Sequence, residues 1–231
     1  MTPVGYWVRL WALKIAVSPW LLYYNSQFDT LRLRDILEDY VLFAHIFVFD
    51  ALRVDDVDPP VIVDAAAYTG LSTLYLSYRF PDAEIVAIEP SPSNFSLLRE
   101  HVGHIDRITC VNKALWGEQT TVTVSDRGVG EWVYSVHHDD QKGVVVETVT
   151  MKDVLAMVDT HRIGLFKVDI EGSEKHVFAN ESEWLASVER IIIETHDFIA
   201  DGCEDALWGA IDRSEWDVRD QGRNIYLERN R

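Results

Sequence analysis

The sequence predicts an α/β protein whose central sheet is mostly parallel and covered by helices on both faces. From residue 61 onward, short apolar runs alternate with segments of helical spacing, and acidic residues lie at the ends of several of the apolar runs. Parallel strands joined by right-handed crossovers bring their carboxyl ends to one edge of the sheet. Ligands of open α/β sheets bind at that edge, so we expect the functional site there.

Helical spacing within residues 6–17 and 36–44 predicts a helical N-terminal cap over 1–58, and the acidic, proline-ended segment 55–60 is the expected linker into a sheet-bearing domain, 59–231. There we expect strands at 61–65, 84–89 and about 108–114, separated by helices at about 70–79 and 93–102. Short strands at 121–124 and 144–146 then flank a polar excursion over 126–143. Helices at 151–158, 173–180 and 203–212 alternate with strands at 164–170, 188–195 and 224–228.

Composition limits the classes of partner. The chain has 231 residues with 48% hydrophobic content, enough to bury one substantial core. Its 38 acidic and 21 basic residues give a net charge of −17, which argues against nucleic acid as a partner. The two cysteines, Cys110 and Cys203, are too few for a disulfide framework, so a cytoplasmic location is expected.

The N-terminal segment is apolar, but its sequence is not typical of a signal peptide or of a membrane-spanning helix. Arg9 and Lys14 interrupt it and no small-residue cleavage site follows, so we expect neither a signal peptide nor a spanning helix. Its aromatic residues are expected in the core or at the surface of a homo-oligomer, with membrane-surface contact as the weaker alternative. They are Trp7, Trp11, Trp20, Tyr23 and Tyr24.

Residues 164–174, Gly-Leu-Phe-Lys-Val-Asp-Ile-Glu-Gly-Ser-Glu, carry the strongest functional signal. An apolar strand delivers Asp169 and Glu171 to its carboxyl end, and Gly172 lets the chain turn at once into a helix. The first strand shows a similar design, since it ends in Asp64 and a small-residue turn that reaches Gly70.

Glu89, followed by Pro90, stands at the end of the next strand and can accept hydrogen bonds from two ribose hydroxyls. The turn after Asp64 lacks the glycines, lysine and hydroxyl residue of a Walker phosphate loop. Taken singly, each acid is more often a solvated strand end. In this order and spacing, the acids predict a nucleotide-type ligand held across the sheet.

These residues resemble the FkbM-type methyltransferases, within the class I S-adenosylmethionine-dependent methyltransferases. The resemblance spans residues 26 to about 196, and the run at 167–174 is its most specific part. It implies a Rossmann-like fold with a seven-stranded sheet and one antiparallel strand, S-adenosylmethionine as cofactor, and methyl transfer, usually to oxygen on a sugar or natural product. The other matching segments are 26–29 with Tyr40, 63–72, Glu89-Pro90 with Phe95 and Leu98, 112–115, 148–153 and 193–196.

The resemblance also implies roles for single positions. The turn would face the methionine part of the cofactor, Glu89 the ribose, the region at 113–114 the adenine, and Asp169 the amine and the transferring methyl group. The family usually has glycine at position 66 and asparagine at 68; alanine at 66 requires a negative φ with its methyl group turned away from the cofactor. The cofactor-binding candidates are Asp64, Ala66, Tyr68, Gly70, Ser72, Glu89, Pro90, Lys113, Ala114 and Asp169.

Methyl transfer to an alcohol needs an oxygen in line with the sulfonium and a base for its proton. Glu171 and His196 are the candidates for the base, with Asp169 orienting. Each has a structural alternative: His196 can be satisfied by Glu194 or Asp197, and Glu171 can simply favour a helix start.

The sequence thus predicts an O-methyltransferase acting on a hydroxyl or carboxyl of a sugar, glycan or natural-product small molecule. Two alternatives stay open: a degenerate, non-catalytic nucleotide-binding or S-adenosylmethionine-binding protein, which would explain Ala66, and a nicotinamide-dependent oxidoreductase, whose usual glycine fingerprint is missing. In the excursion, Trp132 and Tyr134 are expected to stack on a carbohydrate or planar substrate. The His-His-Asp-Asp run at 137–140 is expected to be a solvated turn, since adjacent residues rarely face one ion; the metal requirement stays open.

Overall fold

The computed structural model describes residues 3–55, 57–126, 134–137, 143–160, 162–179 and 182–230. Its central sheet has seven strands in the order β3-β2-β1-β8-β9-β11-β10. Strand β11 is antiparallel to both neighbours, and the other described pairings are parallel. The predicted α/β fold is confirmed. The strands are β1 (Val61–Ala65), β2 (Glu84–Ile88), β3 (Ile108–Val111), β8 (Leu165–Val168), β9 (Arg190–Ile193), β10 (Trp216–Gln221) and β11 (Asn224–Arg229).

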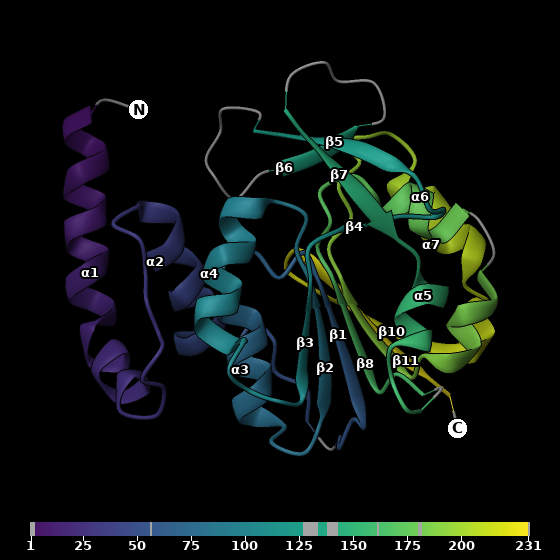
Figure 1. The fold of residues 1–231 in the computed structure, drawn as a ribbon, viewed down its shortest axis with the longest axis horizontal. Helices are drawn as coiled ribbons and strands as arrows, with labels where there is room; N and C mark the ends of the chain where they lie inside the picture. The colour runs from purple at the N-terminus through teal and green to yellow at the C-terminus, as the bar shows by residue number, and fades with distance from the viewer. Residues whose placement is uncertain are drawn as a thin grey trace.

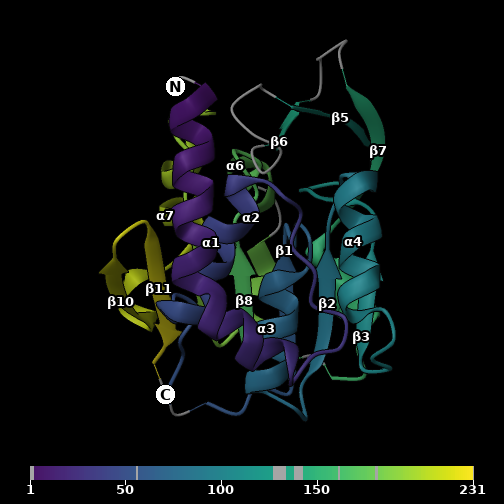
Figure 2. The ribbon, with the colours of Figure 1, turned by 90° about the vertical axis from the view of Figure 1, so that its left-hand side faces the viewer.

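Helices cover both faces of this sheet (Figures 1 and 2). One face carries α3 (Leu71–Arg79) and α4 (Pro92–Val102), with α1 (Pro3–Asn25), α2 (Leu37–Phe43) and the π-helix η1 (Ala44–Val48) outside them. The other carries α5 (Met151–Ala156), α6 (Glu174–Ala179), the 3-10 helix η2 (Ser182–Ser187) and α7 (Cys203–Ala210).

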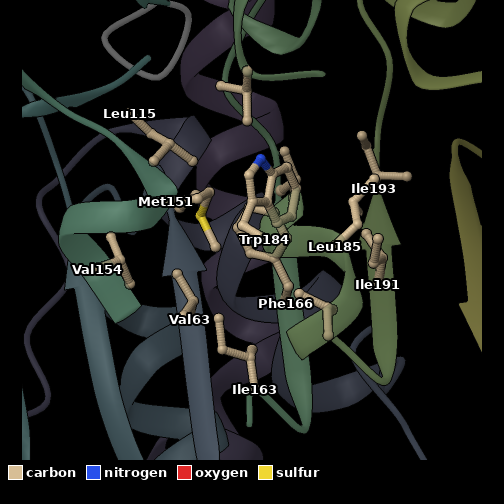
Figure 3. Packing of buried hydrophobic residues seen from close by; sticks show 14 of the residues in the cluster. Val63, Leu115, Met151, Val154, Ile163, Phe166, Trp184, Leu185, Ile191 and Ile193 are labelled. Atoms are coloured by element: carbon tan, nitrogen blue, oxygen red, sulfur yellow. The ribbon is translucent and has the colours of Figure 1, made fainter. Parts of the chain in front are cut away.

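Alternation along the strands produces the two cores. In β1, Val61, Val63 and Ala65 pack into the core under α5, α6 and α7, whereas Ile62 packs under α3 and α4. Figure 3 shows the first of these cores, in which Phe166 meets Trp184 edge-on with ring centroids 5.6 Å apart. The residues of β1 and β8 are buried on both faces, which is typical of central parallel strands and explains why both are apolar apart from Asp64 and Lys167.

A second, smaller sheet stands beyond the carboxyl ends of the main strands (Figure 1). It consists of β4 (Ala114–Leu115), β7 (Val144–Val149), β5 (Thr121–Asp126) and β6 (Tyr134–His137), in that order. The single strand expected at about 108–114 is therefore wrong: it splits into β3 and β4, which lie in different sheets. The side-chain amide of Asn112 lies at the break and donates to the carbonyls of Glu89 and Pro90.

Two further elements differ from expectation. Strand β10 was not predicted, because its sequence Trp-Asp-Val-Arg-Asp-Gln is polar and, as an edge strand, it buries only Trp216. Helix α1 extends beyond the expected spacing over residues 6–17 and runs unbroken through Pro19 to Asn25. In the part of the chain that the structure describes, no helix is both long and apolar enough to cross a membrane.

The expected cap over residues 1–58 is not packed separately from the sheet. Val17, Tyr24 and Phe43 of the N-terminal helices belong to the same core as Ile62 and Leu165 of the strands. Its boundary with the remaining chain stays a prediction. Of the polar excursion, Trp132, His138, Asp139 and Asp140 lie outside the described residues, and for Tyr134 and His137 only the backbone of β6 is described.

Candidate active site

A cavity of about 750 Å³ opens at the carboxyl ends of the parallel strands, within the usual range for small-molecule sites. Its walls come from the β1–α3 turn, from Glu89 and Pro90 after β2, and from the segments that follow β8 and β9. The π-helix with the segment after it, and the turn of the β10–β11 hairpin, contribute further walls. Sequence reasoning missed these two contributions.

The turn after β1 is held in an unusual backbone conformation. Ala66 and Tyr68 have φ values of 56° and 53°, and Gly70 has 87°. The expectation that Ala66 has a negative φ is therefore wrong. Nearby contacts fix the turn: the Lys167 ammonium donates to the carbonyl oxygen of Ala66 at 3.0 Å, and the Tyr68 N–H donates to Glu89 at 2.9 Å. Such tertiary contacts hold residues in the left-handed region that isolated chains avoid.

Asp64 lies beneath this turn and is fully buried. Its carboxylate accepts hydrogen bonds from Ser72 at 2.6 Å and Thr73 at 2.7 Å, and lies 3.3 Å from the Lys167 ammonium. It is absent from the described lining of the cavity. Asp64 thus ties β1 to the start of α3.

Some of the other cofactor-binding candidates line the cavity and some do not. Gly70 also lies outside the described lining; a Cβ there would come within 2.8 Å of Leu98 Cδ1, so close packing explains this glycine. Lys113 is paired with Glu147 at 2.8 Å, away from the described walls. The candidates that do line the cavity are Ala66, Tyr68, Ser72, Glu89, Pro90, Ala114 and Asp169.

Glu89 stands on the cavity wall but is only 3% exposed. Its carboxylate accepts the backbone N–H groups of Tyr68 and Ser91, each at 2.9 Å. Burial raises the pKa of Glu89 to about 7, although these N–H groups favour the charged form.

Lys167 is a wall residue that sequence reasoning missed. Burial opposes its charge, yet Asp64 and Asp169 hold its pKa above the ordinary value. The available signal was a lysine inside an otherwise apolar strand, because a buried charge needs a partner. Lys167 connects β8 to the turn after β1.

The candidate catalytic residues Asp169, Glu171 and His196 come together at the ends of β8 and β9. His196 Nε2 lies 3.5 Å from Asp169 Oδ1 and 3.5 Å from Glu171 Oε2. Glu194 Oε1 is also 3.5 Å away, and Arg223 pairs with this carboxylate at 2.5 Å. On the other side of the ring, Nδ1 bonds to Glu174 Oε1 at 2.7 Å. Glu174 and Arg223 were not among the predicted site residues.

Burial and the neighbouring charges shift the pKa values of His196 and Glu171. Burial alone would lower the pKa of His196, but the bond to Glu174 and the charges of Asp169 and Glu171 raise it to about 9. Burial and the neighbouring Asp169 raise the pKa of Glu171 to about 7. A protonated imidazole has no free lone pair, so His196 as the cluster stands is a hydrogen-bond donor rather than a base.

The N-terminal segment reaches the turn through two polar contacts. Arg34 is bound to Asp39 at 2.8 Å, donates to the Tyr68 hydroxyl, and lies over the Tyr68 ring at 5.0 Å. Buried His101 accepts the Arg32 N–H at 3.0 Å and bonds through Nδ1 to the Thr69 carbonyl. Burial lowers the pKa of His101, which fits a neutral ring in this bridge.

Methyltransferases are among the known proteins that are similar to this chain in sequence or in fold. Two methyltransferases of fungi are similar over part of their length: Methyltransferase 1 of Beauveria bassiana (strain ARSEF 2860), 24% identical over 61% of this chain, and Methyltransferase sdnD of Sordaria araneosa, 29% identical over 59%. The matches cover 66% of each relative, so the chain spans about two thirds of their length. The crystal structure of methyltransferase FkbM from Methylobacillus flagellatus KT has the same fold, with a TM-score of 0.54 and 15% identity over 80% of this chain and 47% of that one.

Residues 64–217 match the methyltransferase FkbM domain. This span begins at Asp64, contains Glu89 and the cluster around His196, and ends in β10. With most of the chain matched and the site inside the matched part, the chain belongs to the FkbM family of S-adenosylmethionine-dependent methyltransferases.

Proposed function

We propose that this protein transfers a methyl group from S-adenosylmethionine to an oxygen of a sugar, glycan or natural-product small molecule. One observation carries the proposal: a ribose-type acceptor, Glu89, and the cluster of Asp169, Glu171 and His196 line one cavity at the carboxyl ends of β2, β8 and β9. When bound, S-adenosylmethionine supplies an electrophilic methyl group on a sulfonium. The residues present fit this cofactor.

The fit can be argued from this chain's own atoms. Glu89 lies on the cavity wall with its carboxylate held by two N–H groups, and this carboxylate is the proposed acceptor for two ribose hydroxyls. The first turn of α3, with Ser72 on the wall, offers N–H groups without helical partners to the methionine carboxylate. Pro90, Ala114 and Leu115 give an apolar wall for the adenine.

Oxygen as the acceptor atom follows from the cluster at the far side of the cavity. Asp169 would lie beside the amine and the transferring methyl group, and Glu171 faces the cavity 3.5 Å from the His196 ring. Carboxylates can orient an acceptor hydroxyl and hold its proton near the transition state. A small acceptor also suits the net charge of −17, which disfavours nucleic acid. We further propose a cytoplasmic location.

Calorimetric titration tests cofactor binding. Glu89→Ala should weaken S-adenosylmethionine binding by about 2–3 kcal/mol, because the two charge-assisted bonds are lost. Glu84→Ala, at the amino end of the same strand, is the matched control and should bind normally. Unchanged affinity in Glu89→Ala would remove the ribose assignment. Tight binding of a nicotinamide dinucleotide in place of S-adenosylmethionine would favour the oxidoreductase.

Transfer itself is followed with S-adenosylmethionine labelled in its methyl group and a panel of sugars, glycans and hydroxylated or carboxylated natural products. Label that survives mild base indicates an ether, and label that is released indicates an ester. The alternative that Ala66 favours is a non-catalytic binding protein. Such a protein would bind the cofactor but label no acceptor.

A further inference from the structure

Two carboxylates and one imidazole converge where the segments after β8 and β9 meet the cavity. One ligand atom from each of Asp169, Glu171 and His196 lies within 4.8 Å of the others. His196 Nε2 is 3.5 Å from each of the two carboxylate oxygens. These separations exceed ordinary N–H···O hydrogen bonds but lie close to the roughly 3 Å between neighbouring ligand atoms around an octahedral ion.

The imidazole is held with one nitrogen directed at this point. His196 is 1% exposed, and its Nδ1 is bound to Glu174 Oε1 at 2.7 Å. Glu174 is itself fully buried, and its other oxygen accepts the Gly172 N–H at 2.8 Å. A carboxylate on the far nitrogen of a histidine is the usual outer support of a metal ligand, because it fixes the ring and makes the near nitrogen more basic.

A fourth acid nearby does not belong to the ligand set. Glu194 lies 3.5 Å from the same nitrogen, but its oxygen is paired with Arg223 at 2.5 Å. The arginine balances this charge at the cavity wall. Asp169 and Glu171 are left as the carboxylates directed at the point that Nε2 faces.

We propose that Asp169, Glu171 and His196 bind one divalent cation of the Mn²⁺ and Mg²⁺ class, which displaces the proton from His196 Nε2. Two carboxylate oxygens favour a hard ion, and the imidazole nitrogen favours Mn²⁺ over Ca²⁺. All three residues line the cavity, so the remaining coordination positions face the space where an acceptor would bind.

The role of the ion, though not its binding, rests on the proposed function. A cation at this point makes an acceptor hydroxyl more acidic. With Asp169 and Glu171 bound to the ion, the proton of the hydroxyl would pass to solvent rather than to these carboxylates. The hydroxyl oxygen would form the bond to the methyl carbon, and the carbon–sulfur bond would break with its electron pair on sulfur. The open positions also favour an acceptor with two neighbouring oxygens, since both can then meet the ion.

The test is titration of the purified protein with Mn²⁺ alone, followed by electron paramagnetic resonance. We expect one site per chain and nitrogen coupling from one imidazole. Asp169→Asn, Glu171→Gln and His196→Ala should each weaken Mn²⁺ binding tenfold or more, and His196→Ala should abolish the nitrogen coupling. Asp82→Asn, an exposed residue before β2 at the opposite edge of the sheet, is the matched control and should bind as wild type.

Lack of Mn²⁺ binding by the wild-type protein, or wild-type affinity in His196→Ala, would overturn the proposal. If a variant does not fold, the nitrogen coupling of the wild-type protein decides, and its absence also overturns the site. Calorimetry with S-adenosylmethionine is run separately on the same samples. If the protein binds S-adenosylmethionine but not Mn²⁺, the metal site is refuted and the proposed function is not. If it binds Mn²⁺ but not S-adenosylmethionine, the proposed function is refuted and the metal site is not.

Discussion

Replacing Ala66 with glycine tests whether the turn after β1 is strained. Ala66 has a φ of 56°, and a Cβ in the left-handed region costs roughly 1–2 kcal/mol. Glycine removes this cost but gives the unfolded chain more freedom, which opposes folding by roughly 0.5–1 kcal/mol. We therefore expect Ala66→Gly to raise the free energy of unfolding by roughly 0.5–1 kcal/mol, or the melting temperature by about 1–4 °C.

Urea unfolding of the wild-type protein and the variant measures this difference. The control is Ala12→Gly on the exposed face of α1, where the backbone is helical and the same substitution should lower stability by about 1 kcal/mol. Calorimetry with S-adenosylmethionine should give affinities within threefold, because the turn keeps its shape. A loss of stability in Ala66→Gly like that of Ala12→Gly would refute the argument from strain. Cofactor binding that tightens tenfold or more would instead show that the natural methyl group weakens the site.

Two more predictions concern titratable residues of the cavity. Because the pKa of Glu89 rises from an ordinary 4.5 to about 7 on folding, its contribution to stability is fully present below pH 4.5 and is lost as pH rises through 7, a change of roughly 3 kcal/mol. Glu89→Gln does not titrate, so its stability relative to wild type should increase between pH 5 and pH 8 in urea unfolding; a difference that does not change with pH contradicts this. Glu171→Gln removes a carboxylate that can hold the acceptor's proton, and His196→Ala removes the donor ring 3.5 Å from that carboxylate. Both variants should keep S-adenosylmethionine binding within threefold and lower turnover on the true acceptor about a hundredfold or more, whereas Asp169→Asn should weaken cofactor binding. Turnover within threefold of wild type in both Glu171→Gln and His196→Ala would leave positioning alone as the source of rate.

The sequence predicted the parallel part of the sheet because burial on both faces makes β1, β2 and β8 apolar apart from one charged residue in each. It also predicted that Glu89 and the Asp169–Glu171 pair would meet at one edge, since parallel strands end together. It did not predict the wall from the π-helix and the β10–β11 hairpin. Those segments are polar or irregular, and only tertiary packing directs them to the cavity.

Two features of the site depend on partners far apart in the chain. Lys167 and Asp64 pair across neighbouring strands but lie 103 positions apart in the sequence, so no local pattern predicts the pairing. The positive φ of Ala66 is likewise imposed from outside, since neither alanine nor its neighbours favour that conformation. Glycine at 66 would have signalled the turn directly.

The strained residues of the described chain gather where function is expected. Besides Asp50, the non-glycine residues with positive φ are Ala66, Tyr68 and Glu171, and all four line the cavity. Left-handed backbone at such residues persists only when surrounding contacts hold it. Here those contacts are the Lys167 ammonium on the Ala66 carbonyl, the Tyr68 N–H on Glu89, and Arg34 on the Tyr68 hydroxyl. Because the same atoms shape the walls, loosening any of them should alter the cavity before it alters the sheet.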